Sequence, residues 1–453
     1  MEVIFNGPMR SGIVLDSQKL LNQGYSRFQR ELVEKLMALY LGEWICPDFR
    51  ARRNNMTFDV DSFQGETIIP RYLICRSFTG EDLEGILDEF HLEAKVQPPR
   101  ENPGKDTAPP LAYFVPDKMD IYLYDYGYAS CVLRGRVTAN IDLEIEEYRN
   151  VVESISSALP DYTELFHSTI AKVAKAIPPE FITLTYHQGT QAGAGGDRPV
   201  WPNMSLGQHI GELFWVHRLF LVPCRDNAEY LRVRHTARIL AYTPKADDLI
   251  DVSQRADMAV YPGNGNSCAV YIAEDTPEAA FMTLKAVIRA QNVFYAALQD
   301  LDRDLFYLNN EGTALHDTRE MEALERHMRY MSETLSRTGF IKSVYDDYDN
   351  QLDPQSIAIW DHLRMVWIMG DMFRALDQKT AIADKAYDRA AQRLLALQSH
   401  QTGNLIAIFL VIICILGALP ALSEHVQRAL GSIVLAFALG AATLLTVRYF
   451  RTK

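Results

Sequence analysis

The chain has 453 residues, and its 45 Lys and Arg against 58 Asp and Glu give a net charge of −13 at neutral pH. This acidity argues against a protein that coats nucleic acid. With 48% hydrophobic and 23% charged residues, the composition excludes a disordered chain, a collagen or a simple coiled coil as a description of the whole. The first twelve residues lack the apolar core of a secretory signal, so we expect a cytoplasmic N-terminal body with free thiols at its scattered cysteines.

Residues 1–272 have the mixed pattern of an α/β body, which we expect to be a cytoplasmic ligand-sensing domain. Apolar spacing predicts a helix over 30–41 and strands over 68–75 and 121–133, the second bending at Gly127. Helices are predicted over 141–159 and 161–176. Further strands are predicted over 181–186, 213–222, 239–242 and 269–272. Loops are predicted over 97–110 and 188–202, and a hairpin turn over 262–266.

A group of basic residues stands out in this acidic chain. If the segment is a strand, Arg232 and Arg234 point to the same face and form a fork suited to phosphate oxygens. This pattern indicates a site for a nucleotide or oligonucleotide effector; the alternative is solvated charge or salt bridges between protomers. The candidate ligand-binding residues are Arg218, Arg232, Arg234, His235 and Arg238, with Arg50, Arg52 and Arg53 as a second group.

Other polar patterns favour no enzyme, metal or cofactor. The glycine-rich loop at 189–196 lacks the Lys-Ser/Thr end of a phosphate loop. Asp346, Asp347, Asp349 and Asp353 could hold a cation, but Asp353 precedes Pro354 as a helix cap. There is no HExxH, no GxSxG and no Cys/His spacing of the kind that zinc needs.

After residue 272 the sequence predicts a stalk of long helices over 273–403. The first helix starts at the Thr276-Pro277 cap and runs to about residue 309, and the second covers 317–345. The third starts after Asp353-Pro354. It meets no Gly-Pro break before the apolar C-terminus, so we expect it to continue into a membrane span.

Residues 404–453 are expected to form two transmembrane helices. The runs 405–422 and 430–447 each hold 18 residues without charge, close to the ~20 that a spanning helix needs. Basic residues flank both runs: Lys385, Arg389 and Arg393 before the first, and Arg448, Arg451 and Lys453 after the second. The positive-inside rule then places both termini in the cytoplasm of a multi-pass protein. The alternatives are a buried helical hairpin and a plain anchor. The expected fold class is an α+β cytoplasmic domain, a long α-helical stalk and two C-terminal transmembrane helices.

This layout resembles the CorA-like family of ion transporters and channels, most recognisably over residues 277–453. The family's Gly-Met-Asn signature is absent, and residues 416–423 read Leu-Gly-Ala-Leu-Pro-Ala-Leu-Ser. The resemblance implies a homo-oligomeric ring, here expected to be a tetramer or pentamer, in the lipid of a bacterial inner membrane, with the first span lining an axial pore for ions. Helical spacing from Asn404 then gives the candidate pore-lining residues Asn404, Ile408, Val411, Ile415 and Leu422.

The sequence therefore predicts an ion channel that its cytoplasmic domain gates, with an apolar bore that closes by dewetting. Proteins of similar layout also serve as effectors of bacterial antiphage systems with nucleotide signals, the Hailong effector being one type, and opening such a pore depolarises the cell. Two alternatives stay open. One is a divalent-cation transporter of CorA-like type. The other is a membrane-anchored scaffold or enzyme without a pore.

Overall fold

The computed structural model describes residues 1–37, 42–46, 49–52, 55–58, 72–90, 112–139, 152–153, 155–184, 210–241, 250–253, 255–276, 278–314, 321–349 and 352–418. The chain forms two compact units. The first contains Met1–Leu308 and Glu333–Ala381, and the second contains Asn309–Ser332 and Ile382–Lys453. The boundary expected after residue 272 thus falls inside the first unit, because the first part of the long helix that follows is buried against the sheet.

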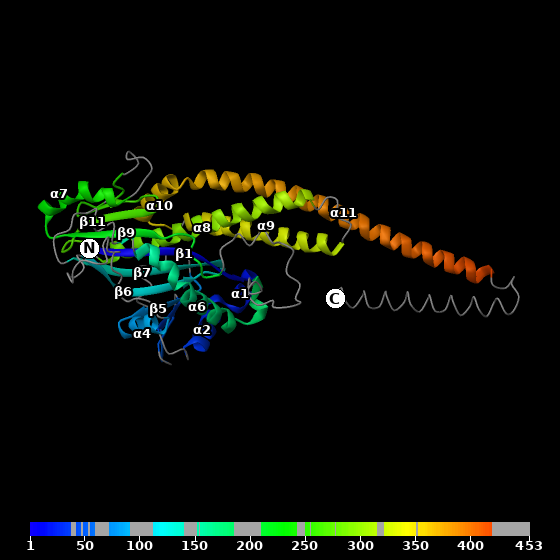
Figure 1. The fold of residues 1–453 in the computed structure, drawn as a ribbon, viewed down its shortest axis with the longest axis horizontal. Coiled ribbons are helices and arrows are strands. Elements are labelled where there is room, and N and C mark those ends of the chain that lie inside the picture. The colour runs from blue at the N-terminus through cyan, green and yellow to red at the C-terminus, as the bar shows by residue number, and fades with distance from the viewer. Residues whose placement is uncertain are drawn as a thin grey trace, which may run out of the picture. The chain divides into compact units, whose positions relative to one another are not determined.

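One sheet of eleven strands organises the first unit (Figure 1). Its order is β10-β11-β9-β1-β7-β6-β5-β2-β3-β4, and β8 pairs with β1. Only β9 and β11 pair in parallel among these strands; the others are antiparallel. The strands are β1 (Glu2–Leu15), β2 (Glu43–Cys46), β3 (Phe49–Arg52), β4 (Asn55–Phe58), β5 (Ile74–Thr79), β6 (Ala112–Leu123), β7 (Tyr126–Ala139), β8 (Ile182–Leu184), β9 (His217–Cys224), β10 (Met258–Tyr261) and β11 (Asn266–Ile272).

The two faces of the sheet bury different side chains, as the period of two along a strand requires. On β7, Ala129, Cys131 and Leu133 belong to the hydrophobic core that the sheet shares with one set of helices. Tyr126 and Tyr128 alternate with them and lie on the opposite face. The helices and 3-10 turns that contribute to this part of the chain are α1 (Ser17–Gln23), α2 (Tyr25–Leu36), α4 (Glu81–Glu89), η1 (Leu159–Tyr162), α6 (Thr163–Ala176), η2 (Pro179–Phe181), α7 (Asn227–Ala237) and η4 (Arg238–Leu240).

The opposite face of the sheet is covered by α8 (Glu278–Ala314). The Phe294 ring stacks on Tyr126 of β7 with ring centroids 5.9 Å apart, and the Arg289 guanidinium lies 3.7 Å from the centre of the Tyr122 ring. Between Ala286 and Leu298 most side chains of α8 are fully buried. A helix buried on all sides is typical of the centre of a large core, so α8 is an internal element of the first unit.

Three more helices follow α8: α9 (Met321–Asp349), α10 (Pro354–Val366) and α11 (Met369–Ala418). An aromatic cluster holds α8, α9 and α10 together: Trp360 of α10 packs on Tyr345 and Tyr348 of α9, and all three contact Phe294 of α8. The expected cap of α10 is confirmed, because the Asp353 carboxylate accepts a 3.0 Å hydrogen bond from the Ser356 backbone N–H. The Thr276 hydroxyl, just before α8, donates a 3.2 Å hydrogen bond to the Asp257 carboxylate.

Several sequence predictions need correction. The strand expected over 121–133 with a bend at Gly127 is a hairpin, β6 turning into β7 around Asp125, and Gly127 follows the turn with a φ of +96°. Of the strand expected over 239–242, residues 239–241 are described and do not form a strand: η4 extends α7 as a 3-10 turn, closed by a hydrogen bond from the Ala241 N–H to the Arg238 carbonyl. The hairpin turn over 262–266 is confirmed, since β10 and β11 pair antiparallel on either side of it.

The third long helix does not run unbroken from Pro354. It is interrupted at Trp367 and Ile368, which separate α10 from α11, although neither residue is a helix breaker. From Met369 onward the predicted continuity of the helix is confirmed, because α11 runs as one helix to Ala418 and includes the start of the first apolar run (Figure 1). Among the residues described, α11 is the single helix long and apolar enough to cross a membrane. The second run, 430–447, and the loops over 97–110 and 188–202 lie outside the described residues.

Candidate functional site

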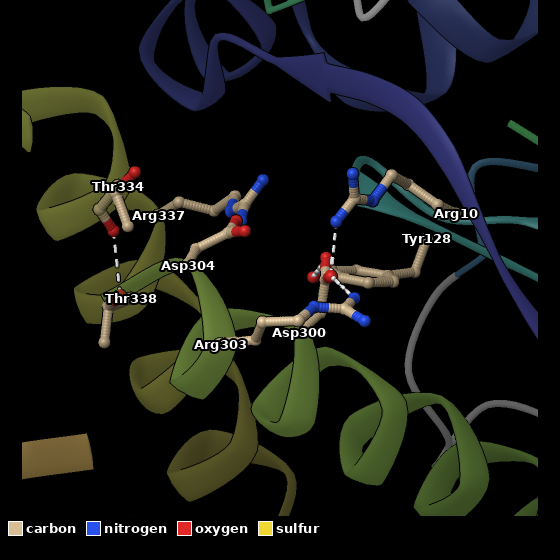
Figure 2. A network of polar contacts seen from close by, with 8 residues as sticks. All are labelled: Arg10, Tyr128, Asp300, Arg303, Asp304, Thr334, Arg337 and Thr338. Atoms are coloured by element: carbon tan, nitrogen blue, oxygen red, sulfur yellow. Dashed lines mark hydrogen bonds and ion pairs between the residues drawn. The ribbon is translucent and has the colours of Figure 1, made fainter. Parts of the chain in front are cut away.

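Two polar sites join the sheet to the long helices, and the first is a buried charge cluster around Asp300. We call it the Asp300 cluster; it consists of Arg10, Tyr128, Asp300, Arg303, Asp304 and Arg337. Figure 2 shows that Arg10 and Tyr128 reach from the strands towards Asp300 on α8, while Asp304 on the same helix faces Arg337 on α9. Strands and helices far apart in the sequence thus meet through ion pairs.

Asp300 is the centre of this cluster. One of its carboxylate oxygens pairs with Arg10 and accepts a 2.7 Å hydrogen bond from Arg303, and the other accepts a 2.8 Å bond from the Tyr128 hydroxyl. Its side chain is 0% exposed. Such charge-assisted bonds are short and strong, and they fix the rotation of α8 against β1 and β7.

The pKa values of the two acids of the cluster, Asp300 and Asp304, shift in opposite directions. Burial alone would raise the pKa of Asp300, but the charges of Arg10 and Arg337 and the bonds from Arg303 and Tyr128 lower it below its usual value. Burial and the neighbouring charge of Asp300 raise the pKa of Asp304, although Arg337 donates a 2.5 Å hydrogen bond to it. Asp300 is therefore the firmly ionised anchor, and Asp304 is the acid that protonates more readily.

Sequence reasoning did not find the Asp300 cluster, although a signal was present. Asp300 and Asp304 lie one helical turn apart on a helix whose neighbouring positions Leu301, Leu305 and Leu308 are fully buried. Two acids on such a helix demand buried partners. Their arginine partners come from β1 and α9, so the sequence alone could not name them.

The second polar site lies where α10 meets α11. We call Trp367 and Ile368 the Trp367 corner. The Trp367 indole N–H donates a 3.0 Å hydrogen bond to the Gly263 carbonyl in the β10–β11 turn, and its ring contacts His217 of β9 and Tyr295 of α8, with centroids 5.5 and 5.3 Å away. The corner is thereby held by three separate elements of the first unit.

The β10–β11 turn is itself organised by His217. The His217 Nε2 lies 3.1 Å from the Ser267 hydroxyl, which accepts a hydrogen bond from the Gly263 N–H. Burial, together with the adjacent charge of Arg218, lowers the pKa of His217 to about 3. His217 is therefore neutral at physiological pH, and its role is to position the turn that receives Trp367.

The burial of His217 predicts how the stability of the protein depends on pH. Because the folded state leaves His217 unprotonated below its ordinary pKa of about 6.5, the unfolded state binds more protons, and the free energy of unfolding falls as the pH drops. We expect a loss of about 2 kcal/mol between pH 7 and pH 5 that His217→Gln abolishes. Burial also raises the pKa of Asp125 to about 6. This makes the free energy of unfolding rise as the pH drops, equally in wild type and in His217→Gln. The difference between wild type and variant in urea unfolding therefore isolates His217; equal pH dependence would contradict its assignment as a buried neutral group.

The predicted effector residues do not form the strand fork expected of them. Arg232, Arg234 and His235 lie on helix α7, not on a strand, so Arg232 and Arg234 point away from each other. The helix forms because Asp226 accepts a 2.8 Å bond from the Glu229 N–H while the Glu229 carboxylate accepts one from the Arg225 N–H.

Three of the basic residues on α7 and η4 are exposed. Arg232, His235 and Arg238 are exposed, whereas Arg234 is half-buried with its guanidinium 5.9 Å from the centre of the Tyr230 ring. Arg218 lies apart from them on β9, where it is half-buried and donates to the Ser156 hydroxyl at 2.6 Å. The second basic group is described only in part: Arg50 and Arg52 lie on β3, and Arg53 is outside the described residues.

The predicted pore residues lie on α11 as far as the structure describes them. Asn404, Ile408 and Val411 are exposed, and Asn404 contacts the His400 ring at 3.0 Å through its amide. Ile415 belongs to the same helix, and Leu422 lies outside the described residues. No group of three or more His, Cys, Asp or Glu within the described part of the chain is arranged to hold a metal ion. Asp353 serves as the cap already noted.

Comparisons with protein-family models, with curated proteins and with solved structures find no match for this chain.

Proposed function

We propose that the protein is an oligomeric ion channel of the inner membrane, in which the cytoplasmic first unit controls a pore lined by α11. The observation that carries this proposal is the continuity of α11. Its first turns are tied to the first unit, because Lys379 binds the Asp302 carboxylate of α8 at 2.7 Å and Lys342 of α9 pairs with Asp377. The same helix ends in the apolar run, with no break after Met369.

The apolar part of α11 has no apolar partner among the described residues. Ile406, Ile408, Leu410, Val411 and Ile413 are each about half exposed, and they point in all directions around the helix. A helix that is apolar on every side is stable in a protein core or in lipid. Exposed isoleucines at this density in water would be a strong aggregation hazard, which favours lipid and neighbouring copies of α11 as their surroundings.

The exposed basic residues of α7 and η4 support control by an anionic effector. The first unit presents Arg232, His235 and Arg238 together on one helix and its 3-10 extension, in a chain with a net charge of −13. Guanidinium groups bind phosphate oxygens in bidentate fashion, so a nucleotide or oligonucleotide is the effector class that this surface fits. Opening of the pore by such a signal would depolarise the membrane, as an antiphage effector requires.

Cys414 offers a direct test of the membrane assignment. It is the exposed cysteine of α11, and the other five cysteines are buried. In inverted membrane vesicles, a charged maleimide is expected to leave Cys414 unmodified until SDS is added, and an alkaline carbonate wash should leave the protein in the membrane pellet. The matched control is Ser399→Cys with Cys414→Ser, whose thiol lies on the same helix before the apolar run and should react in intact vesicles. Equal labelling of the two positions, or release by carbonate, would contradict insertion of α11.

A further inference from the structure

The backbone of the Trp367 corner is strained. Ile368 has a φ of +56° and is the one residue other than glycine with positive φ among the residues described. A β-branched side chain is poorly suited to this left-handed conformation, which glycine adopts without penalty. The side chain of Ile368 is 58% exposed, so its own packing does not compensate the strain.

The glycine of this segment does not relieve the strain. Gly370 lies two residues further on, has no positive φ, and a Cβ added there would meet nothing within 4 Å. Local sequence and local structure therefore disagree at Ile368. Such disagreement persists where surrounding contacts fix the backbone, and it is found at hinges and switches.

Trp367, the residue before Ile368, makes contacts that help to fix this backbone. Its indole hydrogen bond to Gly263 and its ring contacts with His217 and Tyr295 hold the residue before Ile368 in place. One set of helical hydrogen bonds ends here and another begins. The Trp367 N–H bonds to the Leu363 carbonyl of α10, whereas the Ile368 carbonyl accepts the first bonds of α11, from the N–H groups of Asp371 and Met372. No proline follows Pro354 before residue 418. If the Trp367 contacts were lost, no proline would therefore keep α10 and α11 apart.

From these observations we propose that the Trp367 corner is a strained hinge, held bent by docking of Trp367 on the β10–β11 turn, and that release of Trp367 joins α10 and α11 into one straight helix. The inference concerns the first unit alone and does not depend on α11 forming a pore. It assigns the β10–β11 turn a regulatory role. Arg218, an expected effector residue, adjoins the same turn, because its backbone N–H donates to the Gly265 carbonyl and its side chain to Asn266.

The test is a distance measurement by pulsed electron resonance on the full-length protein. Spin labels are placed at the exposed positions Asp361 and Gln378 in a Cys414→Ser background, where the remaining cysteines are buried. A straight helix separates these positions by about 25 Å, at ~1.5 Å per residue, and a bent corner gives a shorter distance. Wild type is expected to show the shorter distance.

Four variants make the proposal falsifiable. Trp367→Ala is expected to raise the ratio of long to short distances about tenfold, the factor that corresponds to losing ~1.4 kcal/mol of docking. Trp367→Phe keeps a ring but loses the N–H donor, so its ratio should lie between those of wild type and Trp367→Ala. It also tests the proposal if the alanine variant does not fold. Ile368→Gly relieves the strain and should lower the ratio below wild type, whereas Gly370→Ala, in open space, should not lower it. An unchanged distance distribution in Trp367→Phe and Ile368→Gly would overturn the hinge.

Discussion

Asp300→Asn is expected to lower the free energy of unfolding by about 3–5 kcal/mol, the cost of leaving buried charges without their counterion. The substitution keeps the shape of the side chain and removes only its charge. It leaves Arg10 without the counterion that it binds and weakens the bonds from Arg303 and Tyr128. Because a domain has ~5–15 kcal/mol of stability in total, a loss of this size would move the urea midpoint strongly.

The same helix supplies the matched control. Asp302 pairs with Lys379, but its side chain is 36% exposed, so Asp302→Asn is expected to cost ~0–1 kcal/mol. Asp304→Asn should cost less than Asp300→Asn, because the pKa of Asp304 is raised and its charge is therefore less stabilising. If urea unfolding, followed by tryptophan fluorescence, gave equal losses for Asp300→Asn and Asp302→Asn, the Asp300 cluster would not be what holds α8 to the sheet.

The second large effect is expected in the proposed pore. Val411→Asp places a charge on the face of α11 assigned to the bore, where an apolar lining excludes water and ions. We expect the variant to raise the resting ion leak of reconstituted vesicles at least about tenfold, which requires only ~1.4 kcal/mol off the barrier. Val411→Leu keeps the lining apolar and should leave the leak unchanged.

A charge on another face of α11 separates a pore effect from general damage. Leu410 precedes Val411 and lies off the predicted pore-lining face, so Leu410→Asp should impair membrane insertion rather than open a path for ions. A Val411→Asp protein that inserts and assembles normally but leaks no more than wild type would remove Val411 from the pore.

Local signals in the sequence located many elements of the structure. The glycine-rich turn between two apolar runs predicted the β10–β11 hairpin, and Asp353-Pro354 predicted the start of α10; both are confirmed. The mixed α/β body followed by helices and one long apolar C-terminal helix also follows from apolar periodicity. These features depend on neighbouring residues, which is why a single sequence contains them.

Features that depend on distant residues were missed. Periodicity could not show that β1, at the very N-terminus, lies inside the sheet between β9 and β7. One local signal was missed as well: the fork of Arg232 and Arg234 was considered only for a strand, whereas the Asp226–Glu229 cap starts helix α7 there. The break at Ile368 has no local signal, since Trp367 is fixed by a turn more than a hundred residues earlier. For β1 and for the break at Ile368, tertiary contacts decide the conformation.

The central claim is that α11 carries a signal from a folded body to an ion-conducting pore. Planar-bilayer recording of the purified full-length protein tests it most directly, after its oligomeric state has been determined in detergent. We predict discrete ion currents from a ring of four or five protomers, with an open probability that responds to nucleotides. No current under any ionic condition, from a protein that is a monomer or dimer, would contradict the claim and leave α11 as an anchor.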